Sequence, residues 1–203
     1  MTAQPRIGVL AIQGDFDAHA KALARAGADA VLVRDARELD GLDALVLPGG
    51  ESTTIAMGME RLALYEPVRA FALSGRPVLG TCAGAILLAR AVENHPVRSL
   101  GLIDVTAVRN AYGTQVDSFV APVDAGAAPG LEGLRCVFIR APRLRDLGAG
   151  VEVLARVDGE PVLIRQGNRF AATFHPELTD DARVHALLVR GTRSLGAARR
   201  LAR

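Results

Sequence analysis

Short apolar runs alternate with helix-like segments through the first half of the sequence, and this alternation constrains the fold more than any other feature. The strand-like runs are Arg6–Ile12, Ala30–Val33, Ala44–Leu47 and Pro77–Gly80. The segments of helical composition are Asp17–Ala26, Thr53–Leu62, Tyr65–Leu73 and Ala85–Val92. Repeated strand–helix units with short connections predict a mainly parallel open sheet with helices on both faces, a three-layer α/β fold.

The second half of the sequence changes to strand-like runs joined by turns. These runs are Leu102–Val108, Val116–Val120, Arg135–Ile139, Val151–Val157, Pro161–Arg165 and Phe170–Phe174. Asp158-Gly159 and Gly167-Asn168 are typical turn pairs. We therefore expect antiparallel strands added to the parallel sheet, followed by a final helix over Asp180–Leu195 with Thr179 as its cap.

Composition limits the class of protein. Half of the 203 residues are apolar, so burial can offset the entropy of ordering and intrinsic disorder is excluded. The apolar runs are strand-sized, too short to span a membrane, and the N-terminus lacks a signal-peptide pattern. The net charge of +2 gives no support for a nucleic-acid or membrane partner. We expect one cytoplasmic domain over residues 1–203, because no repeat, linker or composition break divides the chain.

The two cysteines lie in different surroundings. Neither Cys82 nor Cys136 belongs to a CxxC pair, and a structural disulfide is improbable in a cytosolic chain. Cys136 lies in an apolar strand-like run and is expected to pack in the core. Cys82 lies between glycines in Gly80–Gly84, directly after a strand and before a helix. Such glycines permit a sharp turn that presents a nucleophile at a helix N-terminus, although a buried cysteine in a tight crossover also fits this pentapeptide.

A candidate base for this cysteine follows ninety-three residues later. His175 and Glu177 come after a strand-like run, and residues two apart in an extended chain point to the same side. They can therefore form a base and the carboxylate that orients it, as in a catalytic triad. An isolated pair of this kind is often a surface histidine beside a surface glutamate, but together with the cysteine turn the triad is the better interpretation. The remaining histidines, for which we expect packing or surface roles and no metal site, are His19, His95 and His185.

The turn Pro48–Thr53 closes the third strand, at the edge where parallel sheets bind ligands. Its two glycines let a backbone approach a ligand. A phosphate-binding loop is rejected because no Lys-Ser/Thr ending is present. A plain turn with Ser52 or Thr53 as helix cap stays open as the alternative.

Six stretches, spread in order over nearly the whole chain, carry a family resemblance. They are Gly8–Asp15, Pro48–Thr53, Gly80–Gly84, Arg109–Gly113, Phe138–Pro142 and His175–Thr179. Together they resemble the class I, triad-type glutamine amidotransferases, and more specifically the glutaminase subunits of pyridoxal 5′-phosphate synthase. The resemblance implies a flavodoxin-like, amidotransferase-type sheet. Thr114 departs from the family, which usually has an arginine there.

The resemblance also implies roles for individual residues. Cys82 would attack the side-chain amide of L-glutamine, His175 would act as general base and then acid, and Glu177 would orient His175. The oxyanion would be held by the backbone N–H groups of Gly50 and Ala83. The residues at the family's glutamine-binding positions are Gly50, Glu51, Ser52, Arg109, Ile139 and Arg140. No cofactor or metal is implied.

The family resemblance further implies a partner. The ammonia would pass to a separate synthase subunit that makes pyridoxal 5′-phosphate, within a hetero-oligomeric complex, and the glutaminase would be nearly silent until docked. Gln13–Asp15 and the first helix are expected at that interface. Three alternatives remain: an amidotransferase subunit of another pathway, a non-catalytic regulatory subunit, and a cysteine hydrolase of another substrate on the same fold.

Overall fold

A seven-stranded sheet forms the centre of the computed structural model, which describes residues 4–95, 97–109, 118–124 and 126–201. Its strands, in spatial order, are β10 (Glu152–Val157), β11 (Glu160–Gln166), β12 (Arg169–Ala172), β4 (Val78–Thr81), β3 (Ala44–Leu47), β1 (Arg6–Leu10) and β2 (Asp29–Val33). The five strands from β12 to β2 are parallel, and β10 and β11 extend the sheet in antiparallel fashion. The predicted α/β class with added antiparallel strands is confirmed.

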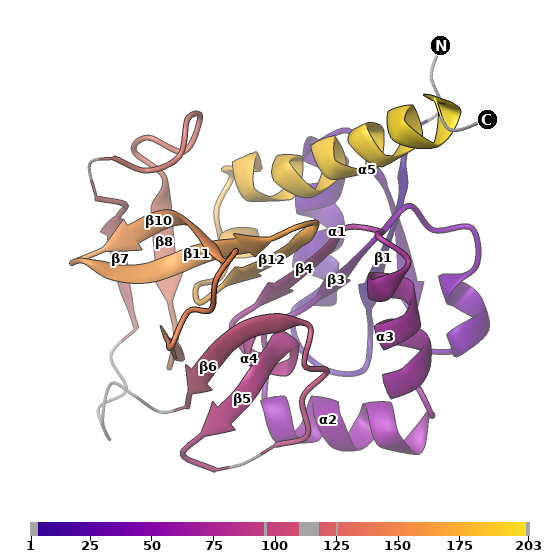
Figure 1. Cartoon of the computed structure of the whole chain (residues 1–203), viewed down its shortest axis with the longest axis horizontal. Helices are drawn as coiled ribbons and strands as arrows, with labels where there is room; N and C mark the ends of the chain where they lie inside the picture. Colours follow the sequence, from indigo (N-terminus) through magenta and orange to yellow (C-terminus); the bar gives the residue numbers. More distant parts are fainter. Residues whose placement is uncertain (1–3, 96, 110–117, 125, 202–203) are drawn as a thin grey trace.

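Helices cover both faces of this sheet (Figure 1). One hydrophobic cluster joins apolar residues of β1 and β3 to α1 (Phe16–Arg25) and α5 (Arg183–Leu201). The opposite cluster joins the sheet to α2 (Ser52–Arg61), α3 (Tyr65–Leu73) and α4 (Ala83–Leu88). Because the sheet is buried from both sides, its central strands are apolar throughout, as in β3, where all four residues are buried.

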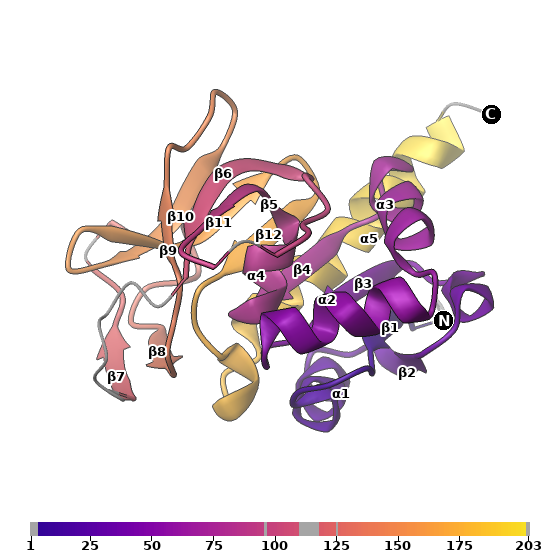
Figure 2. The same cartoon turned by 90° about the horizontal axis from the view of Figure 1, so that it is seen from below.

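Two small sheets carry the remaining strands. One contains β5 (Ala89–Glu93), β6 (Ile103–Val108) and β9 (Arg143–Arg145), and the other is the pair β7 (Phe119–Pro122) and β8 (Arg135–Phe138). Residues of β6 pack into the cluster on the α2–α4 side, whereas Cys136 and Phe138 of β8 join the cluster on the α1–α5 side. Figure 2 shows both small sheets beside the helical layers. Only three of the second-half strands therefore extend the main sheet.

The helix expected over Ala85–Val92 is wrong at its C-terminal end. The helix α4 stops at Leu88, and the chain continues as β5, which pairs in parallel with β6. Arg90 on β5 also lies 3.0 Å from Asp104 on β6. A short apolar run does not distinguish buried helix from buried strand, so the pairing with β6 decides the structure here.

The final helix begins at Arg183, three residues later than expected. Thr179 Oγ1 accepts the N–H of Asp181, and Asp181 Oδ1 accepts the N–H of Arg183. These two side-chain bonds hold the preceding residues in turns, so Thr179 acts before the helix and does not cap it.

Two other expectations fall partly outside the described residues. They concern the Asn110–Gly113 part of the family motif with Thr114, and the first residues of the strand expected over Val116–Val120. None of the helices in the described part of the chain is long and apolar enough to cross a membrane.

Candidate active site

Cys82 occupies the sharp turn between β4 and α4. Its backbone has φ 46°, and its N–H donates to the carbonyl of Ala172 on the neighbouring strand. Both flanking glycines are required by close backbone approach. A Cβ at Gly84 would lie 1.9 Å from the carbonyl oxygen of Leu47, and one at Gly80 would lie 2.4 Å from the carbonyl oxygen of Gly84. The turn therefore holds the thiol at the N-terminus of α4, at the carboxyl edge of the sheet.

His175 and Glu177 lie at the same edge because the strand that precedes them, β12, pairs in parallel with β4, with Ala172 opposite Thr81. His175 Nδ1 lies 2.7 Å from Glu177 Oε1, and the side chains are 8% and 0% exposed. A carboxylate can only accept, so Nδ1 is the donor. The backbone N–H of His175 donates to the carbonyl of Val137 on β8, and this bond fixes the backbone at His175.

The pKa of His175 is raised to about 10. Burial alone lowers it, but hydrogen bonding to Cys82 and Glu177, together with their negative charge, outweighs that desolvation. With Nδ1 engaged by Glu177, the ring presents Nε2 for the interaction with Cys82. The imidazolium form is therefore favoured beside the sulfur, as a Cys–His nucleophile requires.

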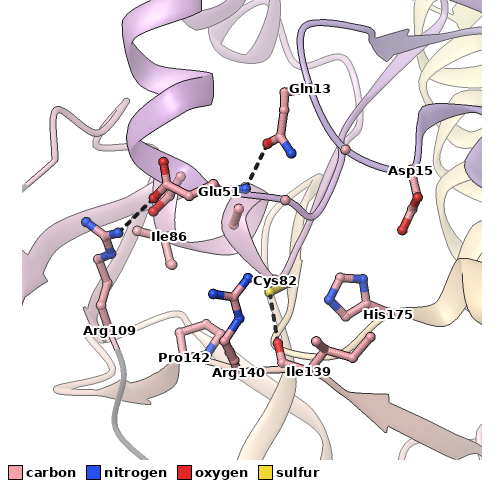
Figure 3. Close-up of a pocket in the computed structure, with 14 residues that line it drawn as sticks. Gln13, Asp15, Glu51, Cys82, Ile86, Arg109, Ile139, Arg140, Pro142 and His175 are labelled. Carbon is pink, nitrogen blue, oxygen red and sulfur yellow. Dashed lines mark hydrogen bonds and ion pairs between the residues drawn. The ribbon is translucent and has the colours of Figure 1, made fainter. Parts of the chain in front are cut away.

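A cavity of about 300 Å³ opens over Cys82 and His175. Figure 3 shows the side chains that converge on it, and they come from six separate segments of the chain. The predicted site residues that line it are Gly50, Glu51, Ser52, Cys82, Ala83, Arg109, Ile139, Arg140 and His175. Glu177 lies behind His175, away from the cavity lining. The structure thus brings together the residues predicted for the triad, the oxyanion site and the glutamine-binding positions.

The Glu51 carboxylate is engaged by neighbouring groups of the protein at the wall of the cavity. Its carboxylate accepts the N–H groups of Thr53 and Thr54, so Glu51 is the cap of α2, where Ser52 or Thr53 was expected. The same carboxylate lies 3.1 Å from Arg109, whose guanidinium also donates to the carbonyl of His95. Burial raises the pKa of Glu51, but these N–H donors outweigh it and lower the pKa to about 2.

The Ile139–Arg140 segment forms the opposite wall. Cys82 Sγ lies 3.8 Å from the carbonyl oxygen of Ile139. Arg140 has φ 45° and is exposed, and its guanidinium points into the cavity beside Cys82 (Figure 3). A left-handed backbone is costly for a non-glycine residue, and here it turns the arginine toward the cavity.

Sequence reasoning did not assign five other lining residues to this site. They are Gln13, Gly14, Asp15, Ile86 and Pro142. Gln13 Oε1 accepts the N–H of Glu51 and so ties the end of β1 to the Gly50–Glu51 turn. The available signal was topological: parallel strands end at one edge, so the turn after β1 meets the turn after its neighbour β3.

The remaining cysteine and histidines have distinct settings. Cys136 is fully buried, and burial raises the pKa of its thiol to about 12, which confirms a core role. His95 is exposed, whereas His19 and His185 are fully buried and bonded to each other. Among the described residues, no three His, Cys, Asp or Glu side chains are grouped as a metal site requires.

Comparison with known proteins fits this geometry. The sequence matches the SNO glutamine amidotransferase family over residues 9–194. It is 50% identical over 190 residues to the "Pyridoxal 5'-phosphate synthase subunit PdxT" of Solibacter usitatus (strain Ellin6076), covering 91% of this chain and 97% of that protein. The PdxT subunit of Frankia casuarinae (strain DSM 45818 / CECT 9043 / HFP020203 / CcI3) is 53% identical over 197 residues, with 96% and 98% covered.

Solved structures agree with the sequence match. The crystal structure of a glutamine amidotransferase superposes with a TM-score of 0.86 at 46% identity, covering 92% of this chain and 98% of that one. The structure of PurLQS from Thermotoga maritima has a TM-score of 0.65 at 18% identity, covering 95% of this chain and 97% of that one, and shows the fold alone. The chain belongs to the SNO glutamine amidotransferase family.

Proposed function

We propose that the protein hydrolyses the side-chain amide of L-glutamine to L-glutamate and ammonia, and delivers the ammonia to a separate synthase subunit that makes pyridoxal 5′-phosphate. The observation that carries this proposal is the 2.7 Å contact between His175 Nδ1 and Glu177 Oε1, behind a cysteine held in a strand-to-helix turn. The family match and the PdxT relatives support the same activity.

In the proposed first step, the Cys82 sulfur attacks the amide carbon of glutamine. The carbonyl π electrons move to oxygen, and the backbone N–H groups of Gly50 and Ala83 stabilise the oxyanion. His175 then gives its Nε2 proton to the amide nitrogen. The carbon–nitrogen bond breaks, ammonia leaves, and a thioester of glutamate remains on Cys82.

In the second step, water hydrolyses the thioester. Neutral His175 removes a proton from the water, the resulting oxygen attacks the thioester carbon, and the sulfur leaves as the thiolate. Glutamate is released and His175 is again protonated beside Cys82. Glu177 holds His175 Nδ1 throughout, so that Nε2 faces the reacting atoms in both steps.

Substrate binding is proposed to use the two walls of the cavity. Arg140 is suited to bind the α-carboxylate of glutamine, because its guanidinium points into the cavity and an arginine can form bidentate hydrogen bonds with a carboxylate. Ile139 and the Gly50–Ser52 turn supply backbone and small-side-chain contacts. Arg109 shapes this region through its ion pair with Glu51.

We further propose that residues 1–203 act as a single amidotransferase domain that docks on its synthase as part of a hetero-oligomeric complex. The two hydrophobic clusters lie on opposite faces of the same sheet, which supports the assignment of a single domain. Gln13–Asp15 and α1 are the proposed docking region. Since Gln13 contacts Glu51, a partner bound there would also reach the Gly50–Glu51 turn and could complete the oxyanion site.

The test is ammonia release from glutamine with and without the cognate synthase subunit, for wild type and Cys82→Ala. We expect activity only in wild type, and a strong increase when the synthase is present. Full activity of Cys82→Ala would overturn the assignment. Full activity of the free wild-type subunit would leave the chemistry intact and contradict the gating by docking.

A further inference from the structure

Glu177 has a second carboxylate oxygen that faces a histidine outside the triad. Glu177 Oε1 meets His175, whereas Oε2 lies 3.4 Å from His19 Nε2, and both side chains in this second contact are 0% exposed. Glu177 Oε2 is buried and has no hydrogen-bond partner among the described residues, and His19 Nε2 is the nitrogen that lies near it. A buried carboxylate oxygen without a donor is costly, so the facing nitrogen of His19 matters to how Glu177 is held.

His19 is held in place by two further contacts. Its Nε2 lies 3.1 Å from Thr81 Oγ1, on the residue before Cys82, and its Nδ1 lies 2.9 Å from His185 Nε2 on α5. His19 itself comes from α1. The ring therefore links α1, α5 and the end of β4 directly to the carboxylate of the triad.

The contacts of the two rings select one tautomer. A proton on His19 Nε2 can be donated toward Thr81 Oγ1 and Glu177 Oε2, while Nδ1 accepts the N–H of His185 Nε2. His185 Nδ1, which has no partner among the described residues, is then an unprotonated nitrogen. The opposite tautomer would leave a buried N–H of His185 unbonded and would point the lone pair of His19 at a carboxylate, which is repulsive.

We propose that His19 is a positioning residue of the triad, whose neutral ring donates from Nε2 to Glu177 Oε2 and so holds Glu177 aligned with His175. The proposal rests on the proposed glutaminase function. Burial, with the nearby charges of His185 and His175, keeps the pKa of His19 well below its usual value, so the donor is a neutral ring. The glutamate is thus held through both of its oxygens, one by each histidine.

The variants His19→Gln and His19→Asn make a matched pair, because a glutamine amide reaches the position of Nε2 and an asparagine amide reaches only that of Nδ1. Both are assayed for glutamine hydrolysis in complex with the synthase subunit, beside wild type and Cys82→Ala. We expect His19→Asn to lower kcat about tenfold, the value of one hydrogen bond to a charged group, with KM little changed. His19→Gln should keep most of the activity.

The pH profile of kcat/KM gives a readout that a packing role would not move. Glu177 helps to raise the pKa of His175, so in His19→Asn, where Glu177 is less well aligned, the alkaline limb should move to lower pH by up to about one pH unit. The titratable or charged groups that face this cluster are His175, Glu177, His19, His185, Arg25 and Cys82, and only His19 is changed. The profile of His19→Gln should match wild type.

Three results would overturn the proposal. They are a wild-type kcat and pH profile in His19→Asn, an equal loss of kcat in His19→Asn and His19→Gln, and a His19 ring in the wild-type protein that carries its proton on Nδ1 and not on Nε2. The tautomer is read from the ¹⁵N NMR shifts of His19 in the unmodified protein, so it is independent of whether a variant folds. We expect a proton on Nε2. Wild-type activity with the synthase and inactivity of Cys82→Ala keep the proposed function standing whichever way the His19 variants fall.

Discussion

The Glu51 carboxylate and the Arg109 guanidinium lie 3.1 Å apart and join the first turn of α2 to the segment after β6. Glu51 also accepts two backbone N–H groups of its own helix, so one carboxylate performs two structural tasks at the cavity wall. Glu51 and Arg109, which the family resemblance relates to substrate, thus contact each other. Arg140 is the arginine whose guanidinium points into the cavity beside Cys82.

Glu51→Ala should destabilise the protein by about 1 kcal/mol, the typical value of a lost helix cap. The pKa of Glu51 is lowered from 4.5 to about 2, so the stabilisation is complete above pH 4.5 and is lost as the pH falls toward 2. Urea unfolding at pH 7 and at lower pH measures the difference. Met57→Ala is the control, because Met57 is an exposed residue of the same helix that takes no part in the cap. A constant difference between wild type and Glu51→Ala down to pH 2 would contradict the capping role.

Gly84→Ala should destabilise the protein by about 3 kcal/mol, at the upper range for overpacking, because its Cβ would meet a backbone carbonyl that cannot move aside. Gly101→Ala is the matched control. Gly101 has φ 62°, and no described atom lies within 4 Å of an added Cβ, so only backbone strain of about 1 kcal/mol applies. Thermal and urea unfolding compare the two. A loss in Gly84→Ala no larger than that in Gly101→Ala would contradict the close contact with Leu47.

The sequence predicted the fold and the triad because both follow from local patterns. Strand–helix alternation implies a parallel sheet, and parallel strands deliver Cys82 and His175 to one edge regardless of the distance between them in the chain. The end of α4 was mispredicted because Ala89–Glu93 is decided by pairing with β6, which no local pattern contains.

Contacts between distant side chains could not be read from the sequence either. His19 lies on a helix with ordinary spacing, and its contact with Glu177 joins residues from opposite ends of the chain. Likewise, Glu51 replaces the better cap residues Ser52 and Thr53 because Gln13 and Arg109 hold its backbone and carboxylate. Tertiary contacts of this kind override local propensity.

His185→Gln should flatten the loss of stability on acidification. Burial lowers the pKa of His185 from 6.5 to about 4, so the unfolded chain binds this proton first. Stability is therefore full above pH 6.5 and falls by about 1.4 kcal/mol per pH unit as the pH drops toward 4. Urea unfolding between pH 7 and pH 4.5 should show a smaller slope in His185→Gln than in wild type. The exposed His95 gives the control His95→Gln, and an unchanged slope in His185→Gln would contradict the buried neutral ring.

Arg140→Ala should raise the KM for glutamine with a smaller effect on kcat. The guanidinium of Arg140 points into the cavity beside Cys82, where it can bind the α-carboxylate in both the ground state and the transition state. Loss of a hydrogen-bonded charged group should raise KM at least about tenfold. Steady-state glutamine hydrolysis in complex with the synthase subunit measures this, with Arg145→Ala on β9 as an arginine control that does not line the cavity. Because alanine at position 140 carries much the same left-handed backbone strain, a loss of kcat at unchanged KM would assign Arg140 to the chemistry and not to binding.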